Sequence, residues 1–198
     1  MPARVKKTEE KKPDSRGRRI RREILSFLRP VLIACGISLL LTQGLFVNAT
    51  VPTGSMKDTI EEKDRLIAFR LAYLWEEPKR GDIIIFDPED YPGEHFIKRV
   101  IGLPGETVEG RDGYVYIDGR PLEEPYVRET LASDFGPFTV PEESYFVMGD
   151  NRNRSKDSRY WEHPYVDKED ILGKALFRYY PGLSLYEAPD YGEAEENQ

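Results

Sequence analysis

The sequence predicts a mainly β protein preceded by one N-terminal membrane-spanning helix. Residues 31–50 contain no charged side chain and follow a strongly basic segment, which is the pattern of a membrane anchor. After residue 50, short runs of β-branched and aromatic residues alternate with Gly and Pro turn signals, and no long helical period appears. Hydrophobic residues make up 39% of the 198 residues, which is enough to build a core.

The first element is the basic segment 1–29. Residues 1–30 hold eleven lysines and arginines against four acidic residues. Such a segment is typical of a solvated tail, and its cations attract anionic lipid headgroups with about 1 kcal/mol per basic residue near the surface. We therefore expect membrane lipid to be one partner of this chain.

The second element is the predicted anchor, residues 30–50. Its length matches the roughly 20 residues that a spanning helix needs, and Pro30 suits a first helical turn. Because basic residues stay on the cytoplasmic side, the tail is expected in the cytoplasm and the rest of the chain outside it. A cleavable signal peptide is the alternative, since Val47, Asn48 and Ala49 form a small-x-small cleavage sequence.

The third element is the body, residues 51–186, which we expect to be built of short strands. Turn signals such as Asp112-Gly113 and Asp118-Gly119 flank residues 114–117, which indicates a hairpin. The acidic segment 187–198 is expected to be a disordered tail. The predicted strands are 65–69, 83–86, 96–101, 114–117, 145–148 and 175–179.

Composition excludes several classes of function. The chain has one cysteine and two histidines, so a disulfide within the chain, a cysteine cluster and a multi-histidine metal centre are not expected. Residues 51–198 hold 32 acidic and 18 basic residues. Since phosphate binding needs a cationic surface, nucleic acid is not expected as a partner.

Three segments of the body carry candidate chemistry. Ser55 lies in a Pro/Gly-constrained loop directly after the predicted anchor. Lys98 shares one face of a predicted strand with Phe96 and Val100, where burial would lower its pKa, although a solvated edge-strand lysine is the plainer interpretation. Residues 149–159 contain no aliphatic side chain and many hydrogen-bonding groups, which favours a polar network.

These residues leave two ways to activate a serine. A Ser-His-Asp triad would use His95 or His163 as its base. A serine–lysine dyad would use Lys98 instead.

Taken together, four segments resemble the boxes of type I signal peptidases, membrane-bound serine–lysine proteases that remove signal peptides. VPTGSM at 51–56 resembles the nucleophile box, and 80–86 the strand box that follows it. Residues 98–106 resemble the general-base box, and 149–159 the last box. Thr53 stands where the family usually has serine, and Asp58 where it commonly has proline. The resemblance covers about residues 30–180.

The resemblance implies a fold and a set of roles. The fold is a body of coiled antiparallel β-sheets of the signal peptidase type, here with a small inserted cap lobe at about 105–145, and it needs no metal or cofactor. Ser55 is implied as nucleophile and Lys98 as general base. The other implied roles are an oxyanion hole formed by the Thr53 hydroxyl and the Ser55 N–H, support by Ser155 together with an Asp157–Arg159 salt bridge, and substrate pockets lined by Val51, Met56, Phe96 and Ile97.

The function that the resemblance implies is removal of N-terminal signal peptides from exported preproteins. Cleavage would follow small residues, in the pattern Ala-x-Ala, at the outer face of the cytoplasmic membrane. A peptidase with the same dyad but one dedicated substrate, such as a conjugation-type maturation peptidase, is the alternative enzyme. An anchored scaffold with a decayed site is the non-enzyme alternative, although it would be expected to have lost Ser55 or Lys98.

Overall fold

The computed structural model describes residues 15–191, and it divides the chain into a unit that ends at Leu41 and a body that begins at Thr42. The first unit consists of helix α1 (Ser15–Leu39), which continues into the π-helical turn η1 (Leu40–Leu45). Residues Ile20–Thr42 are long and apolar enough to cross a membrane, with a mean hydropathy of 2.2 over their most apolar window. Part of the predicted basic tail, residues 1–14, lies outside the described residues.

The end of the anchor differs from the prediction of residues 30–50. Its last five residues form strand β1 (Phe46–Thr50), which pairs antiparallel with β2 (Arg65–Phe69). Val47 and Ala49 of β1 pack against the core of the body. The apolar side chains that extended the predicted span therefore belong to the sheet, and the apolar helix lies earlier in the chain.

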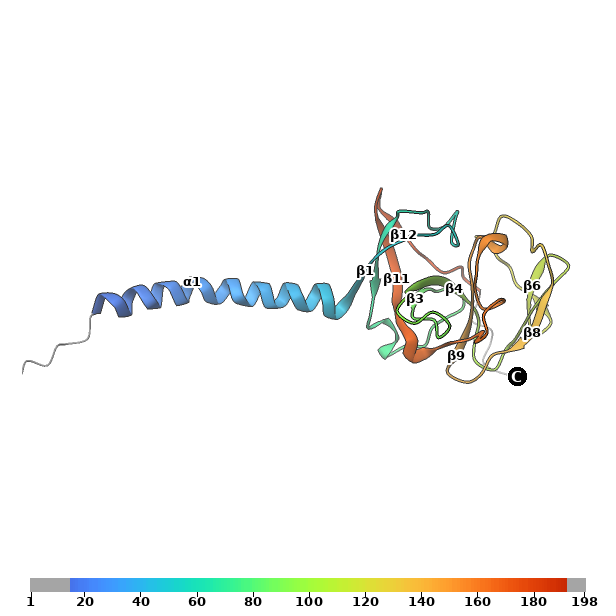
Figure 1. Ribbon diagram of the computed structural model, residues 1–198, viewed down its shortest axis with the longest axis horizontal. Coiled ribbons are helices and arrows are strands. Elements are labelled where there is room, and N and C mark those ends of the chain that lie inside the picture. Colours follow the sequence, from blue (N-terminus) through green and yellow to red (C-terminus); the bar gives the residue numbers. More distant parts are fainter. Residues whose placement is uncertain (1–14, 192–198) are drawn as a thin grey trace, which may run out of the picture. The chain divides into compact units, whose positions relative to one another are not determined.

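The main sheet of the body is curled and antiparallel (Figure 1). Its strands lie in the order β1-β2-β11-β3-β4-β9-β10, with β12 paired to the far end of β11. Register shifts interrupt the pairing of β11 with both of its neighbours and of β4 with β9, and such bulges increase the local twist of a sheet. The remaining strands are β3 (Ile83–Phe86), β4 (Phe96–Gly102), β9 (Ser144–Met148), β10 (Val166–Asp167), β11 (Ile171–Tyr180) and β12 (Ser184–Leu185).

A second, four-stranded sheet has the order β7-β6-β5-β8 and lies within the range predicted for the cap lobe. Its strands are β5 (Thr107–Arg111), β6 (Tyr114–Ile117), β7 (Arg120–Pro121) and β8 (Phe135–Thr139). A Cβ at Gly110 of β5 would overlap the Phe135 ring, so this strand pair needs a glycine there. Val108 and Val115 pack with Ile101 and Phe146, which joins the lobe to the main sheet. Short 3₁₀ turns complete the body: η2 (Ala72–Leu74), η3 (Arg152–Arg154) and η4 (Lys168–Asp170).

The mainly β prediction is confirmed, and every strand predicted in the body is present within a residue or two except 175–179, which is part of the longer β11. Strands β5 and β8 and the two-residue strands β7, β10 and β12 were not predicted. The expected C-terminal tail begins differently: Ala188, Pro189 and Tyr191 lie directly against Gly81, because that glycine leaves room where a Cβ would stand 3.0–3.2 Å from them. Residues 192–198 of the tail lie outside the described part of the chain.

Candidate active site

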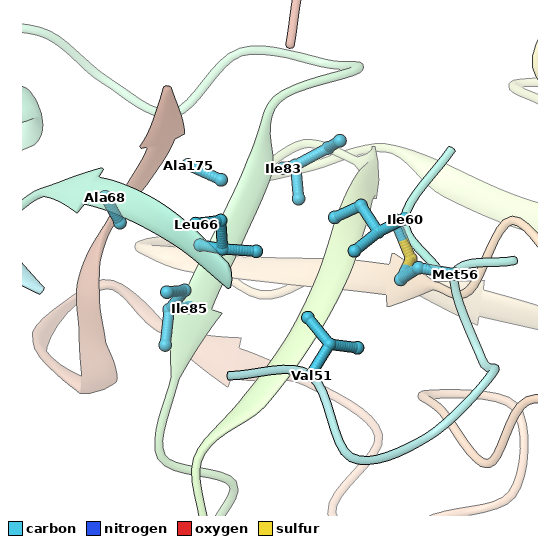
Figure 2. Close-up of a cluster of buried hydrophobic side chains, with 8 residues drawn as sticks. All are labelled: Val51, Met56, Ile60, Leu66, Ala68, Ile83, Ile85 and Ala175. Atoms are coloured by element: carbon cyan, nitrogen blue, oxygen red, sulfur yellow. The ribbon is translucent and has the colours of Figure 1, made fainter. Parts of the chain in front are cut away.

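The loop that carries Ser55 follows β1 and is held by its apolar side chains. Val51, Met56 and Ile60 point into the cluster formed with Ile83 and Ile85 (Figure 2). Backbone hydrogen bonds from Val51 N to the Asp64 oxygen (3.0 Å) and from Lys63 N to the Val51 oxygen (2.8 Å) close the loop. Ser55 is half-buried at the turn between these anchors, so its backbone is fixed while its side chain stays reachable.

Lys98 lies in the middle of the main sheet, on β4 between β3 and β9. The interpretation as a solvated edge-strand lysine is therefore wrong, since the residue is only 4% exposed. Its Nζ donates to Ser55 Oγ at 2.7 Å and to the Ile97 carbonyl oxygen at 3.0 Å, and it lies 5.4 Å from the centre of the Phe96 ring.

Burial lowers the pKa of Lys98 from 10.5 to about 8, while the carboxylates of Asp157 and Asp150 oppose this shift. Loss of hydration destabilises the ammonium form, and this effect is larger than the attraction of the two carboxylates. At pH 7 a base with this pKa is neutral in about one molecule in ten, against roughly one in three thousand for a solvated lysine. The neutral amine beside Ser55 Oγ can accept the serine proton.

The segment 149–159 forms a polar network, as its composition predicts, and Asp150, Arg152, Ser155, Asp157 and Ser158 are its buried members. Arg159 Nε donates to Asp157 Oδ1 at 2.7 Å, and both side chains are buried. Asp157 Oδ2 accepts from the Gly149 N–H at 2.9 Å, and Ser158 Oγ accepts from the Val147 N–H at 2.9 Å. The Asp157–Arg159 pair therefore ties this segment to the end of β9.

Ser155 is placed beside the site without the contact that was expected. Its Oγ is buried, and no hydrogen bond joins it to Lys98 or to any other residue of the described chain. A Cβ at Gly149 would overlap both the Ser155 hydroxyl and the Ser55 carbonyl oxygen, so Ser155 lies close to the Ser55 backbone. Its role in orienting Lys98 stays a prediction.

Sequence reasoning missed the residues that hold the Ser55 backbone. The Asn151 N–H donates to the Ser55 carbonyl oxygen at 3.1 Å, and Asn151 Nδ2 donates to that of Gly54 at 2.9 Å. The neighbouring Asp150 accepts from Arg99 Nε at 2.9 Å and Nη2 at 2.6 Å. The available signal was that Arg99 follows Lys98 and points to the opposite face of β4, towards the same polar segment.

The residues predicted to line substrate pockets fall into two groups. Phe96 and Ile97 are half-buried and keep accessible surface, whereas Val51 and Met56 are core residues that offer almost none. Their burial follows from their part in anchoring the Ser55 loop. Thr53, predicted for the oxyanion hole, is exposed two residues before Ser55.

Asp58 marks a real difference from the pattern that the sequence resembles. Its φ angle is +81°, a value that the proline ring, fixed near −65°, cannot adopt. The turn after Ser55 therefore has a shape that a proline at this position would not allow.

The two histidines are exposed, and each lies beside a carboxylate of its own. His95 pairs with Asp87, and His163 Nδ1 lies 2.7 Å from Asp90 Oδ1. No contact joins either ring to Ser55 in the described residues, which does not favour the triad. Across residues 15–191, no group of three or more His, Cys, Asp or Glu side chains is arranged to hold a metal ion.

Comparison with known proteins points to one family. Residues 24–180 match the family model described as signal peptidase, peptidase S26. The signal peptidase I of Leptolyngbya laminosa is 43% identical over 158 residues, covering 76% of this chain and 75% of that protein. The signal peptidase I of Bacillus licheniformis is 37% identical over 184 residues, covering 88% and 95%.

One solved structure, a signal peptidase I from Enterococcus faecalis V583, matches with 42% identity and a TM-score of 0.44, covering 50% of this chain and 97% of that one. The extent of the family match and the identity with its members together decide the assignment. The chain therefore belongs to the signal peptidase family, peptidase S26, and is a serine peptidase.

Proposed function

We propose that this protein is a membrane-anchored endopeptidase that removes N-terminal signal peptides from exported preproteins with a Ser55–Lys98 dyad. The observation that carries the proposal is the 2.7 Å contact between Lys98 Nζ and Ser55 Oγ, with Lys98 buried and its pKa lowered to about 8. Family membership supports signal peptides as the substrate class.

In the first step, neutral Lys98 accepts the proton of Ser55 Oγ while this oxygen attacks the scissile carbonyl carbon. The resulting ammonium then gives its proton to the leaving amine, and the amino-terminal part of the substrate stays on Ser55 as an ester. Water attacks this ester with Lys98 again acting as base, which regenerates the enzyme.

The negative charge on the substrate oxygen needs donors in both tetrahedral intermediates. We assign the Thr53 hydroxyl and the Ser55 N–H to this role, and one such donor is worth about 2.7–4 kcal/mol of transition-state stabilisation. An extended substrate would add to an exposed strand edge by β-augmentation, with small pockets that select Ala at the first and third positions before the cut. Phe96 and Ile97 are the accessible apolar side chains beside Lys98 that suit such pockets.

The helix Ile20–Thr42 supports anchoring in the cytoplasmic membrane. The basic residues before it favour a cytoplasmic N-terminus and an extracytoplasmic body, where exported preproteins emerge. Protease added to intact spheroplasts should then digest the body, and protection of the body would refute this orientation.

The direct test is cleavage of a preprotein with an Ala-x-Ala site by the purified full-length protein in detergent. Wild-type protein should release the signal peptide, and Ser55→Ala should not. A panel of unrelated preproteins separates a general signal peptidase, which cleaves several, from a peptidase with one dedicated substrate. Equal cleavage by Ser55→Ala would refute the assignment of the nucleophile.

A further inference from the structure

The last described residues of the chain, Ala188, Pro189 and Tyr191, pack against Gly81 in the turn before β3. Gly81 has a φ of +90°, and a Cβ there would stand 3.0 Å from Pro189 Cδ and 3.0 Å from Tyr191 Cε2. This close approach places the Tyr191 ring directly on the turn before β3. The same turn contacts the polar network, because Arg99 Nη1 donates to the Gly81 carbonyl oxygen at 2.8 Å.

Tyr191 is the first donor in a chain of hydrogen bonds that runs through Tyr126 to Glu124. The Tyr126 hydroxyl donates its only proton to Glu124 Oε1 at 3.0 Å, so in its 3.0 Å contact with Tyr191 the Tyr191 hydroxyl is the donor. Burial raises the pKa of both tyrosines, which keeps both hydroxyls protonated. Glu124 also forms a paired contact with the guanidinium of buried Arg152. Tyr126 is therefore held between Tyr191 and the Glu124–Arg152 pair.

The face of the Tyr126 ring supports the arginine that holds Asp150. The Arg99 guanidinium carbon lies 3.9 Å from the centre of the Tyr126 ring, at a cation–π contact distance. Arg99 is 2% exposed, and its guanidinium donates hydrogen bonds to Asp150 and to the Gly81 carbonyl oxygen. Tyr191 thus contacts both groups that hold the Arg99 guanidinium, namely Gly81, whose carbonyl accepts from it, and Tyr126, whose ring lies against it.

Asp150 is connected to the Ser55 backbone through its neighbour in the chain. The next residue, Asn151, binds the backbone oxygens of Gly54 and Ser55 through its side-chain amide and its N–H. A displacement of Asp150 would therefore move Ser55 relative to Lys98, whose Nζ lies 2.7 Å from Ser55 Oγ.

We propose that Tyr191 is a positioning residue for Ser55, and that residues 188–191 act as a strap that fixes the nucleophile from behind. The strap holds Tyr126 and Gly81, these hold Arg99 and Asp150, and Asn151 then fixes the Ser55 backbone. The inference rests on the proposed function, because it takes Ser55 to be the nucleophile.

Two substitutions separate the hydroxyl of Tyr191 from its ring. Tyr191→Phe removes only the hydrogen bond to Tyr126, while Tyr191→Ala also removes the ring from Gly81. We expect kcat for preprotein cleavage to fall about 10-fold in the alanine variant and less in the phenylalanine variant, with KM within about twofold, because misplacing a nucleophile slows the chemical step. Tyr114→Ala, at an exposed tyrosine of β6, is the matched control and should keep wild-type kcat.

Hydrogen exchange supplies a readout that does not depend on activity. The Asn151 N–H donates to the Ser55 carbonyl oxygen, and we expect it to exchange several-fold faster in Tyr191→Phe than in the protein with Tyr191. Its exchange rate should not change in Tyr114→Ala. All rates are measured on full-length protein in a Ser55→Ala background. Since Tyr191→Phe keeps the ring on Gly81, it provides the test if the alanine variant does not fold.

The outcomes separate the strap from the proposed function. Wild-type kcat in Tyr191→Ala, or an unchanged Asn151 exchange rate in Tyr191→Phe, overturns the strap. Absence of cleavage by the wild-type protein overturns the proposed function instead, and the exchange comparison still decides whether Tyr191 holds the Ser55 backbone.

Discussion

Replacing Lys98 with methionine should stabilise the body while it abolishes activity. The folded pKa of Lys98 is about 8, below the 10.5 of a solvated lysine, so between these values the unfolded chain binds more protons than the folded one. The contribution of Lys98 to the free energy of unfolding therefore rises with pH across this window, and the full desolvation cost of its ammonium applies below pH 8. At about 1.4 kcal/mol per pH unit, the buried ammonium costs about 3 kcal/mol at pH 7.

Methionine has an unbranched side chain of similar length and no charge, so this cost disappears in the variant. The stability difference between Lys98→Met and wild type should narrow by about 2 kcal/mol from pH 7 to pH 9.5, as the wild-type amine becomes neutral. This change with pH is independent of how well methionine packs, since packing contributes equally at both pH values.

The measurement is urea unfolding of the full-length chain in detergent, followed by the fluorescence of buried Trp161. Lys57→Met, at an exposed lysine two residues after Ser55, is the matched control. A difference for Lys98→Met that stays constant from pH 7 to 9.5 would refute the argument that Lys98 is a desolvated base.

Three further predictions concern the surroundings of the dyad. Thr53→Val should lower kcat about 10²–10³-fold with little effect on KM while Thr53→Ser stays active, and wild-type kcat in the valine variant would remove Thr53 from the oxyanion hole. Asp157→Asn should lower the free energy of unfolding in urea by about 3–5 kcal/mol, since the buried Arg159 guanidinium keeps its bond to the Arg152 carbonyl but loses its carboxylate partner, and a loss below 1 kcal/mol would contradict this. His95→Gln/His163→Gln should keep most activity in the preprotein assay, whereas its loss would support a histidine base.

The fold was predictable where local signals agree. Residues 83–86 combine a β-branched run with turn signals on both sides, and they form β3 as expected. Phe46–Thr50 was assigned to the anchor because it continues an uncharged apolar segment, and only its pairing with β2 makes it a strand. Strands β5 and β8 contain Gly110, Gly136 and Pro137, which weaken the local signal, and their neighbours override it.

The site was predictable only in part, for a physical reason. Ser55 and Lys98 are 43 residues apart, and either alone has an ordinary interpretation. The resemblance to a family brought them together, whereas the lowered pKa of Lys98 depends on its burial between β3 and β9. The contacts of Asn151 and Tyr191 have no local pattern at all, because each joins loops that meet only in the folded body.

The central claim is that buried Lys98 is the base that activates Ser55, and the pH dependence of kcat/KM tests it most directly. For wild-type protein in detergent with an Ala-x-Ala preprotein, kcat/KM should rise with pH through an apparent pKa near 8 and then level off. Lys98→Arg should be inactive across the whole range, since a guanidinium keeps its proton. A Lys98→Arg variant that retains a wild-type profile would contradict the account.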